Sequence, residues 1–393
     1  YLQRASFVNF VGHTKEGMLG MVFRKETALE VDAGIEYIKA NANGEGLSAD
    51  QLIKLAAADT LLVGRFGLLV DYPQMREGLT AAQTAGQEAR ILTYPAESII
   101  NWRCETINGK QRLSMVVLRE PTEKVSDDGF EVVELMYHRV LLLVDGVYIQ
   151  RLYDENDDLL GTDQDGTFTA DIVPRKADGS TWSVIPFSFV GSINNDEAID
   201  KAPLYDIAEI NIAHYRNSAD YEESSFLVGQ PTPVFSGLTQ SWVDQNMGDG
   251  VAFGSRAAVL LPESGSASLL QAGDNQMPLK GMEIKEQQMV RIGTRIIQDR
   301  GGVETAEAAK IRFAGQNSKL GAIIGNVEES FSQCLVWAME FMGGTLEPEI
   351  AINREFYATD HGSYATDGSG RHCAARPAAP ATPFGYDFRR AHR

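Results

Sequence analysis

Three observations predict an α+β fold for this chain of 393 residues. The stretch from Arg90 to Val190 has apolar residues with period two, as antiparallel strands do. Two long helical patterns flank a segment rich in Gly, Ser and Pro. A third helical pattern, of unusual length, follows a Gly-Gly pair. We therefore expect a β-rich lobe joined to a pair of long helices, with a further long helix returning to the lobe.

The first 190 residues are expected to form one block. Ser48 precedes an apolar helical pattern and is a good N-cap. The apolar run at 64–73 predicts a buried strand that ends at Pro73. Residues 74–89 are rich in Gly, Ala and Gln, and we expect a mobile insertion there.

A largely antiparallel sheet is predicted in the second half of this block. Gly-containing dipeptides typical of hairpin turns separate its strands. The turns are Asn108-Gly109, Asp128-Gly129 and Asp145-Gly146. The predicted strands are Arg112–Arg119, Glu131–Val144, Val147–Tyr153 and Gly166–Val173.

Residues 191–225 are predicted to be a linker and the first long helix. Pro203 suits the first turn of a helix, where no N–H is needed. The helical pattern has apolar residues on more than one side, which indicates a crowded environment. Residues 226–276 have few charges, and we expect short strands there, at 257–261 and 268–271, joined by loops.

A second long helix is predicted within residues 277–300, ended by Gly301-Gly302. From Val303 to Met342 apolar residues recur every three or four positions, which predicts a very long or kinked helix. The expected kink positions are Gly315, Gly321 and Gly325. A strand-like stretch at 347–356 completes the block 305–356.

The two ends of the chain have a different character. Tyr1–Lys25 resembles a segment from the middle of a longer chain, and we expect the natural N-terminus to be missing. Residues 357–393 have no apolar periodicity and cannot build a core. This tail is expected to be either an out-of-frame or artefactual sequence or a native disordered tail.

Composition limits the classes of function. The longest apolar run, Val140–Val144, is far too short to cross a bilayer, so no membrane partner is expected. Cys104, Cys334 and Cys373 include no C-x-x-C pair, which favours a reducing compartment and argues against a disulfide framework or a zinc site.

The net charge of −19 argues against a protein that grips nucleic acid. An acidic channel is compatible with DNA that slides through it, because few contacts would hold the phosphates. The charge alone does not choose between such a conduit and a protein that never meets DNA.

Searching for catalytic or cofactor-binding patterns identifies no catalytic residue and no cofactor. The acidic stretch 154–165 suggests a calcium site, because Asp154, Asn156 and Asp158 occupy alternate positions, as ligands do in an EF-hand loop. However, Leu159 stands where the EF-hand needs Gly, and Asp165 where it needs Glu. A solvated acidic hairpin loop is the favoured interpretation, and no metal site is assigned.

Charged residues on the two long helices are candidates for contacts between subunits. The first helix carries an acidic set that includes Asp206, Glu209 and Asp220. This set is either a solvated face or the acidic wall of a tunnel. Arg291 and Arg295 on the second helix could pair with these carboxylates on a neighbouring subunit.

Several long phrases in a fixed order resemble the portal proteins of tailed bacteriophages. The resemblance is closest to a portal family of phages and prophages once labelled only as a domain of unknown function. It covers roughly Tyr1–Phe356. The phrases are RASFVNFVGHTKEGMLGMVFRK, LLVGRFGLLVDYP, APLYDIAEINIAHYRNSADYEESSFLVGQPTPVFSGL, GMEIKEQQMVRIGTRII and ETAEAAKIRFAGQNSKL.

The resemblance implies a portal-like architecture. Residues 1–190 would form the wing with its β-rich lobe, and 191–225 the linker and first stem helix. Residues 226–276 would form a small α/β clip and 277–300 the second stem helix. Residues 301–304 would be the tunnel loop, 305–356 the long wing helix and a strand, and 357–393 a tail without a counterpart. The candidates to face DNA are Arg300, Gly301, Gly302, Val303 and Glu304, with Arg300 contacting either a phosphate or a neighbouring carboxylate.

The resemblance also implies a function without catalysis. The chain would be one subunit of a ring of twelve at one capsid vertex of the virion, and it would be made in the host cytoplasm. Double-stranded DNA would pass through its channel during packaging and ejection without being read. Terminase, the major capsid or scaffolding protein, and a tail adaptor would be its partners. The alternatives are another head–tail ring or adaptor protein, or a metal-dependent enzyme that uses the loop 154–165.

Overall fold

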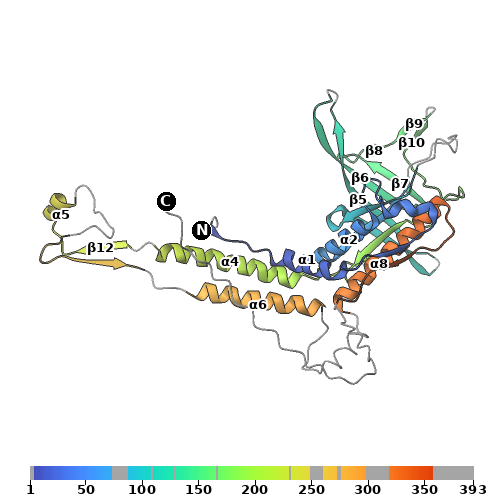
Figure 1. Cartoon of the computed structure of the whole chain (residues 1–393). Coiled ribbons are helices and arrows are strands. Elements are labelled where there is room, and N and C mark those ends of the chain that lie inside the picture. Colours follow the sequence, from blue (N-terminus) through green and yellow to red (C-terminus); the bar gives the residue numbers. More distant parts are fainter. Residues whose placement is uncertain are drawn as a thin grey trace, which may run out of the picture. The chain divides into compact units, whose positions relative to one another are not determined.

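The computed structural model describes residues 4–72, 87–107, 109–126, 129–164, 167–229, 232–247, 260–271, 276–297 and 318–356. Helices and strands are mixed along the chain (Figure 1). The helices are α1 (Phe10–Val22), η2 (Ala33–Lys39), α2 (Ala49–Val63), η3 (Ala96–Ser98), α4 (Tyr205–Val228), α5 (Gln240–Asn246), α6 (Met277–Ile297) and α8 (Lys319–Met342). The strands are β1 (Ala28–Glu30), β2 (Arg65–Asp71), β3 (Arg90–Pro95), β4 (Ile99–Ile107), β5 (Lys110–Val125), β6 (Val132–Val144), β7 (Val147–Tyr153), β8 (Leu159–Leu160), β9 (Thr162–Gln164), β10 (Thr167–Thr169), β11 (Phe187–Gly191), β12 (Thr232–Ser236), β13 (Ser266–Leu270) and β14 (Glu349–Ala351).

Local sequence signals account for several of these elements. Ser48 caps α2 in a reciprocal capping box with Gln51, and Gly64 ends the helix in the left-handed conformation. The turn between β6 and β7 has positive φ at Asp145 (50°) and Gly146 (79°), as a two-residue hairpin of the Asp-Gly type requires. Both features agree with the sequence predictions.

Two antiparallel sheets make up the lobe. Strands β4 to β8 form a five-stranded meander in the order in which they occur along the chain. A second sheet has the order β11-β2-β3, so its central strand β2 pairs with a strand that lies far away in sequence. All strand pairs in both sheets are antiparallel, in accord with the predicted sheet.

The core lies where α8 and α2 pack against β2 and β11. The buried side of α8 carries residues about one helical turn apart. They are Leu320, Ile324, Val327, Phe331, Cys334, Leu335 and Ala338. Burial raises the pKa of the Cys334 thiol, which therefore stays protonated and packs as a small apolar group.

A buried polar network links the two sheets. Arg139 on β6 donates to Asp71 at the end of β2 (3.0 Å) and forms an ion pair with Glu120 on β5 (2.8 Å). Glu120 also accepts the hydroxyl proton of Tyr94 on β3. Gln150 on β7 donates to the second oxygen of Asp71 (3.0 Å). Because each carboxylate shares the same guanidinium, the network holds the sheets in one register relative to each other.

A buried arginine fixes the linker that leads into α4. The guanidinium of Arg65 lies 4.3 Å from the ring centroid of Trp102 and 4.1 Å from that of Phe189. It donates to the backbone carbonyls of Glu197 (3.0 Å) and Ala198 (3.3 Å). Burial lowers the pKa of Arg65, and nearby carboxylates oppose that shift. The linker that precedes α4 is thereby held to the lobe.

The structure decides one part of the prediction for the third long helix. Of its two alternatives, an uninterrupted helix from 303 to 342 is excluded, because Ser318 is a non-helical N-cap whose side chain accepts from the N–H of Gly321, and α8 starts at Lys319. Residues 303–317 lie outside the described residues. Gly321 and Gly325 lie inside α8, so neither breaks it. Gly315 lies outside the described residues.

Two smaller predictions are also corrected. The strand expected at 257–261 is absent at Leu260 and Leu261, while 257–259 lie outside the described residues. Strand β13 occupies 266–270, where 268–271 was expected, and its partner β12 was not predicted. The short helix α5 was also missed, because seven residues give too little periodicity to recognise.

Candidate functional site

The two long helices α4 and α6 form an antiparallel hairpin, side by side in Figure 1. Three contacts give their alignment. His214 Nε2 lies 3.2 Å from Glu286 Oε1. A Cβ placed on Gly293 would lie 3.8 Å from Ile207 Cδ1, and one placed on Gly281 would lie 2.4 Å from Asn217 Nδ2. Residue numbers therefore rise along one helix as they fall along the other.

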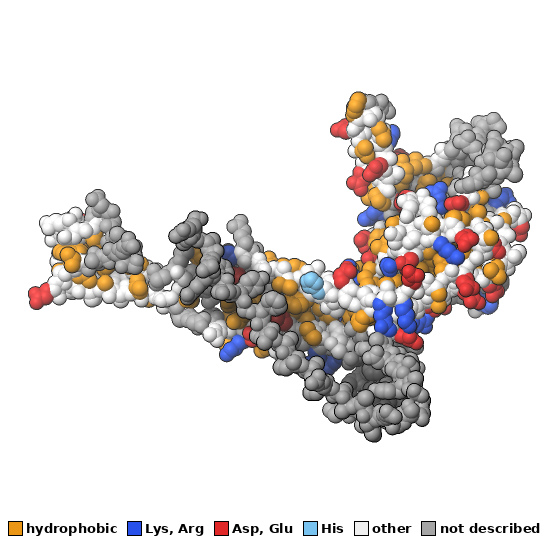
Figure 2. All heavy atoms as spheres, viewed as in Figure 1, with side chains coloured by type: hydrophobic (Ala, Val, Ile, Leu, Met, Phe, Trp, Pro, Cys, Tyr) orange, Lys and Arg blue, Asp and Glu red, His pale blue; other side chains and the backbone are white. Residues whose placement is uncertain are grey.

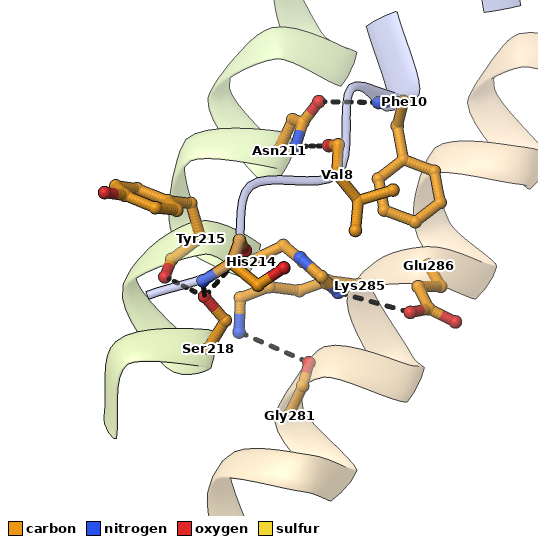
Figure 3. A network of polar contacts seen from close by, with 10 residues as sticks. Val8, Phe10, Asn211, His214, Tyr215, Ser218, Gly281, Lys285 and Glu286 are labelled. Atoms are coloured by element: carbon orange, nitrogen blue, oxygen red, sulfur yellow. Dashed lines mark hydrogen bonds and ion pairs between the residues drawn. The ribbon is translucent and has the colours of Figure 1, made fainter. Parts of the chain in front are cut away.

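An extended segment, residues 4–9, runs along α4 in the opposite direction (Figure 3), and we call it the strap. Asn211 is buried, and its amide group donates to the carbonyl of Val8 (2.8 Å). Its side-chain oxygen accepts from the N–H of Phe10 (3.0 Å) and Val11 (3.4 Å). Asn211 thus accepts hydrogen bonds from N–H groups at the start of α1 that have no partner within that helix, and it caps α1 from a different helix.

A second polar residue, Ser218, contacts the strap two helical turns further along α4. Its hydroxyl accepts from the N–H of Ser6 (3.2 Å), and the carbonyls of Ser6 (2.9 Å) and Tyr215 (2.7 Å) are both within reach as acceptors. Arg4 pairs with Glu223 (2.5 Å) and lies over the ring of Phe226 (3.6 Å to the centroid). Asn211 and Ser218 therefore hold the strap through its backbone, and Arg4 holds it through a side chain.

His214 lies between the strap and α6. Its side chain is 4 % exposed, and the ring of Phe10 meets it edge to face at 5.3 Å. Its Nε2 faces Glu286, whereas Nδ1 is buried without a hydrogen-bond partner among the described residues. The surroundings suit a packed histidine that couples three elements. They do not present the ring to an open pocket.

The candidate assembly residues lie on both helices, and among the described residues no ion pair joins a candidate on α4 to a candidate on α6. Asp206 accepts from Lys201 (2.7 Å), and Glu209 accepts from the hydroxyl of Tyr205 (2.6 Å). Arg291 and Arg295 are exposed, and the part of the chain that the structure describes offers neither of them an ion-pair partner. Lys201 has a raised pKa, chiefly through its hydrogen bond to Asp206.

The charges of the two helices are opposite in sign. On α4 the acidic residues Asp206, Glu209, Asp220, Glu222 and Glu223 outweigh the single base Arg216. On α6 the basic residues Lys280, Lys285, Arg291 and Arg295 outweigh Glu283 and Glu286. The alignment of the hairpin places Glu209 level with Arg291, and Asp206 within one residue of the level of Arg295.

The predicted tunnel loop lies outside the described residues. Arg300, Gly301, Gly302, Val303 and Glu304 all belong to the stretch 298–317, for which no placement is described. Their proposed role remains a prediction from the sequence.

The acidic stretch 154–165, expected to be a hairpin loop, is a turn only at 154–158, after β7. Its described remainder includes the short strands β8 and β9, and residue 165 lies outside the described residues. Asp154 Oδ1 accepts from the N–H groups of Asn156 (2.8 Å) and Asp158 (2.9 Å), and these bonds lower its pKa. Asp157 adopts positive φ (62°). One carboxylate therefore closes the turn. Among the described residues no group of three His, Cys, Asp or Glu side chains is arranged to hold a metal ion.

Two shallow grooves flank strand β11. One, of about 330 Å³, is lined by residues that include Asn195, Glu329 and Ser330. These side chains bond to one another or to the backbone: Asn195 donates to Glu329 (3.0 Å), and Ser330 donates to the carbonyl of Phe189 (3.1 Å). The other, of about 260 Å³, includes Cys104, whose pKa is raised by burial. Asn195, Glu329 and Ser330 in the first groove thus form hydrogen bonds within the chain.

Comparison with known proteins gives matches of two kinds. Residues 203–342 match a family described as "Domain of unknown function (DUF4055)", a range that extends from the turn before α4 to the end of α8. None of the curated proteins matches the sequence. No described helix is both long and apolar enough to cross a membrane.

Similar solved structures include chains of a gene transfer agent particle and a phage portal protein. A chain from the virion of a native gene transfer agent particle has 14% identity, with 90% of this chain and 82% of that chain covered and a TM-score of 0.44. A chain from the neck of that particle, computed with C12 symmetry, has 13% identity over 88% of this chain and 80% of that chain, with a TM-score of 0.45. An HK97 family phage portal protein from Corynebacterium diphtheriae has 11% identity over 88% of this chain and 92% of that chain, with a TM-score of 0.35.

Proposed function

We propose that this chain is a subunit of a ring-shaped phage portal at a capsid vertex, where it forms the channel for DNA packaging and ejection. The observation that carries the proposal is the helical hairpin with opposite charges at matching levels. Copies related by rotation about an axis parallel to the hairpin keep each residue at one height. The acidic side of α4 then meets the basic side of α6 in the next copy, as a heterologous ring contact requires.

The sequence phrases that resemble portal proteins support the same function. In this proposal, residues 1–190 are the wing, α4 and α6 are the two stem helices, and the segment between them is the clip. Residues 300–304 are the tunnel loop, and α8 belongs to the wing. Arg291 and Arg295 of one subunit face Asp206 and Glu209 of its neighbour.

The net charge of −19 suits a conduit that DNA crosses without sequence reading. The clip and wing would dock the other parts of the particle: terminase, the major capsid or scaffolding protein, and a tail adaptor. The subunit would be made in the host cytoplasm and end in the virion.

The alternative with the most support is another head–tail ring or adaptor protein with no DNA in its channel, because the same charge complementarity would close such a ring. A metal-dependent enzyme at 154–165 has less support, since Asp154 is engaged by backbone N–H groups. Saturable calcium binding by the purified protein, lost on Asp158→Asn, would favour that alternative.

The experiment that tests the proposal is paired charge reversal, read by electron microscopy and sedimentation. Arg291→Glu should reduce the ring fraction, and the double variant Arg291→Glu, Glu209→Arg should restore it. Lys39→Glu on the lobe is the control, with the same charge change away from the helices. Equal ring fractions in all variants would contradict this interface.

A further inference from the structure

The strap lies on the surface of α4 and contributes no residue to the buried core. None of residues 4–9 is buried, and Phe7 and Val8 are 56% and 39% exposed. In Figure 2, hydrophobic side chains reach the surface in the region where Figure 1 shows the start of the chain beside α4. Because little apolar area is covered, hydrogen bonds, one ion pair and two ring contacts hold the strap. Detaching the strap therefore costs much less than opening the lobe.

The face of α4 beneath the strap is polar. Asn211, His214 and Ser218 follow one another at intervals of three and four residues, so they share one side of the helix, and all three are buried. Apolar side chains there would have to stay covered, whereas these polar groups can bind water when the strap leaves. His214 Nδ1 has no hydrogen-bond partner among the described residues and would gain one from water. The strap and the surface that it covers therefore both tolerate separation.

Helix α1 has a cap of its own that does not depend on the strap. Asn9 is a non-helical N-cap (φ −82°, ψ 74°), and its side chain accepts from the N–H of Gly12 (2.8 Å). Its carbonyl accepts from the N–H of His13 (3.1 Å). Further along, Met18 and Val22 hold α1 in the core. Residues 4–8 can therefore turn away about Asn9 while α1 stays folded.

The strap connects the C-terminal part of α4 to α1. Val8 is bound at Asn211, and Arg4 is bound at Glu223 and over the ring of Phe226. Twelve helical residues, about 18 Å of rise, separate Asn211 from Glu223. Through the strap and Asn9, this length of α4 is attached to a helix that is anchored in the core.

We infer that the strap is a latch, a segment that opens about Asn9 as one unit while α1 and the lobe stay folded, and that the closed latch stiffens the C-terminal part of α4. Opening releases Glu223 and Phe226 from Arg4 and gives the polar face of α4 to water. The inference concerns a single chain and does not require ring formation. In the proposed portal, the latch would set how rigidly the first stem helix is attached to the wing.

Hydrogen exchange in the purified full chain tests whether the strap opens as one unit. The reporter is the N–H of Ser6, which donates to Ser218. Arg4→Ala removes the contacts with Glu223 and Phe226 and leaves the reporter's own bond in place. Exchange at Ser6 should accelerate about fivefold, while the amides of α1 and β2 keep their rates.

Arg151→Ala is the matched control for this measurement. It is the same substitution, and it also removes a surface ion pair, the one between Arg151 and Asp171 on the lobe. Exchange at Ser6 should be unchanged in this variant.

A cross-link tests whether the closed latch stiffens α4. Phe7→Cys and Tyr215→Cys replace two rings that meet edge to face, with centroids 5.7 Å apart. The chain also carries Cys104→Ser and Cys373→Ser, and Cys334 is buried, so a short bismaleimide joins only the new pair. In the linked protein the amides of residues 221–226 should exchange more slowly, by about threefold or more, than in the same protein blocked with N-ethylmaleimide.

Four outcomes would overturn the inference. Unchanged exchange at Ser6 in Arg4→Ala would mean that the strap residues open singly. Exchange at Ser6 as slow as that of the β2 amides would mean that the strap opens only with the whole fold. Failure of the cross-link to form would exclude the closed position of the strap. Equal exchange at residues 221–226 in linked and blocked protein would exclude the stiffening of α4.

Discussion

Replacing Asn211 by Ala should release the strap from α4. The substitution removes two short hydrogen bonds, to Val8 (2.8 Å) and Phe10 (3.0 Å), and one long one, to Val11 (3.4 Å). At about 1 kcal/mol for each short bond, and less for the long one, the free energy needed to detach the strap and the start of α1 from α4 should fall by about 2–3 kcal/mol. The loss is not expected to exceed this range, because the backbone groups of the strap form hydrogen bonds to water once the strap detaches.

Hydrogen exchange is the direct assay, since the N–H groups of Phe10 and Val11 are themselves donors in these bonds. Their exchange should accelerate at least tenfold in Asn211→Ala, while the amides of β2 keep their rates. Asn217→Ala is the matched control. It is the same substitution on the same helix, and the Asn217 side chain has no hydrogen bond among the described residues. Unchanged exchange at Phe10 and Val11 would refute the reasoning.

Three further predictions concern the lobe and the helices. Arg139→Met should lower the free energy of unfolding by about 3–5 kcal/mol, because Asp71 and Glu120 lose their shared cation. Adding Asp71→Asn to the same chain should recover part of this lost stability, as measured by denaturant titration. Asp32, whose pKa is lowered by backbone N–H bonds, should contribute stability above the unfolded-state pKa and lose it as pH falls through the folded pKa. Asp32→Asn should therefore flatten the acid limb of the stability profile. Arg295→Glu should reduce assembly measured by sedimentation without changing the monomer's circular dichroism, and full assembly would exclude an ionic role for this residue.

Elements with local causes could be predicted from the sequence. Ser48 and Gly64 bound α2 through their own side-chain and backbone chemistry, and Asp145-Gly146 makes a turn that depends on two residues. The long helices were predicted because each has many turns of apolar pattern. The first helix was predicted at 203–225 and is observed as α4 at Tyr205–Val228. The two ranges differ only by a few residues at each end, where helix boundaries are least certain.

What could not be predicted depends on partners distant in sequence. The pairing of β2 with β11 joins residues more than a hundred positions apart, and the run at 64–73 gives no signal of its partner. The same holds for Asn211 and the strap, where a polar residue next to apolar positions of the helical pattern was the available clue. Arg139 could not be recognised as largely enclosed (its side chain is 16% exposed), since a strand arginine is usually exposed.

The central claim is that copies of this chain close into a ring with a hole. Negative-stain electron microscopy of the purified protein, with class averages viewed down the particle axis, tests it most directly. The account predicts rings with a central channel, since opposite charges at matching levels of the hairpin suit a heterologous contact between copies. The resemblance to portal proteins implies about twelve-fold symmetry. Discrete assemblies without a central channel, or monomers at all concentrations, would contradict it.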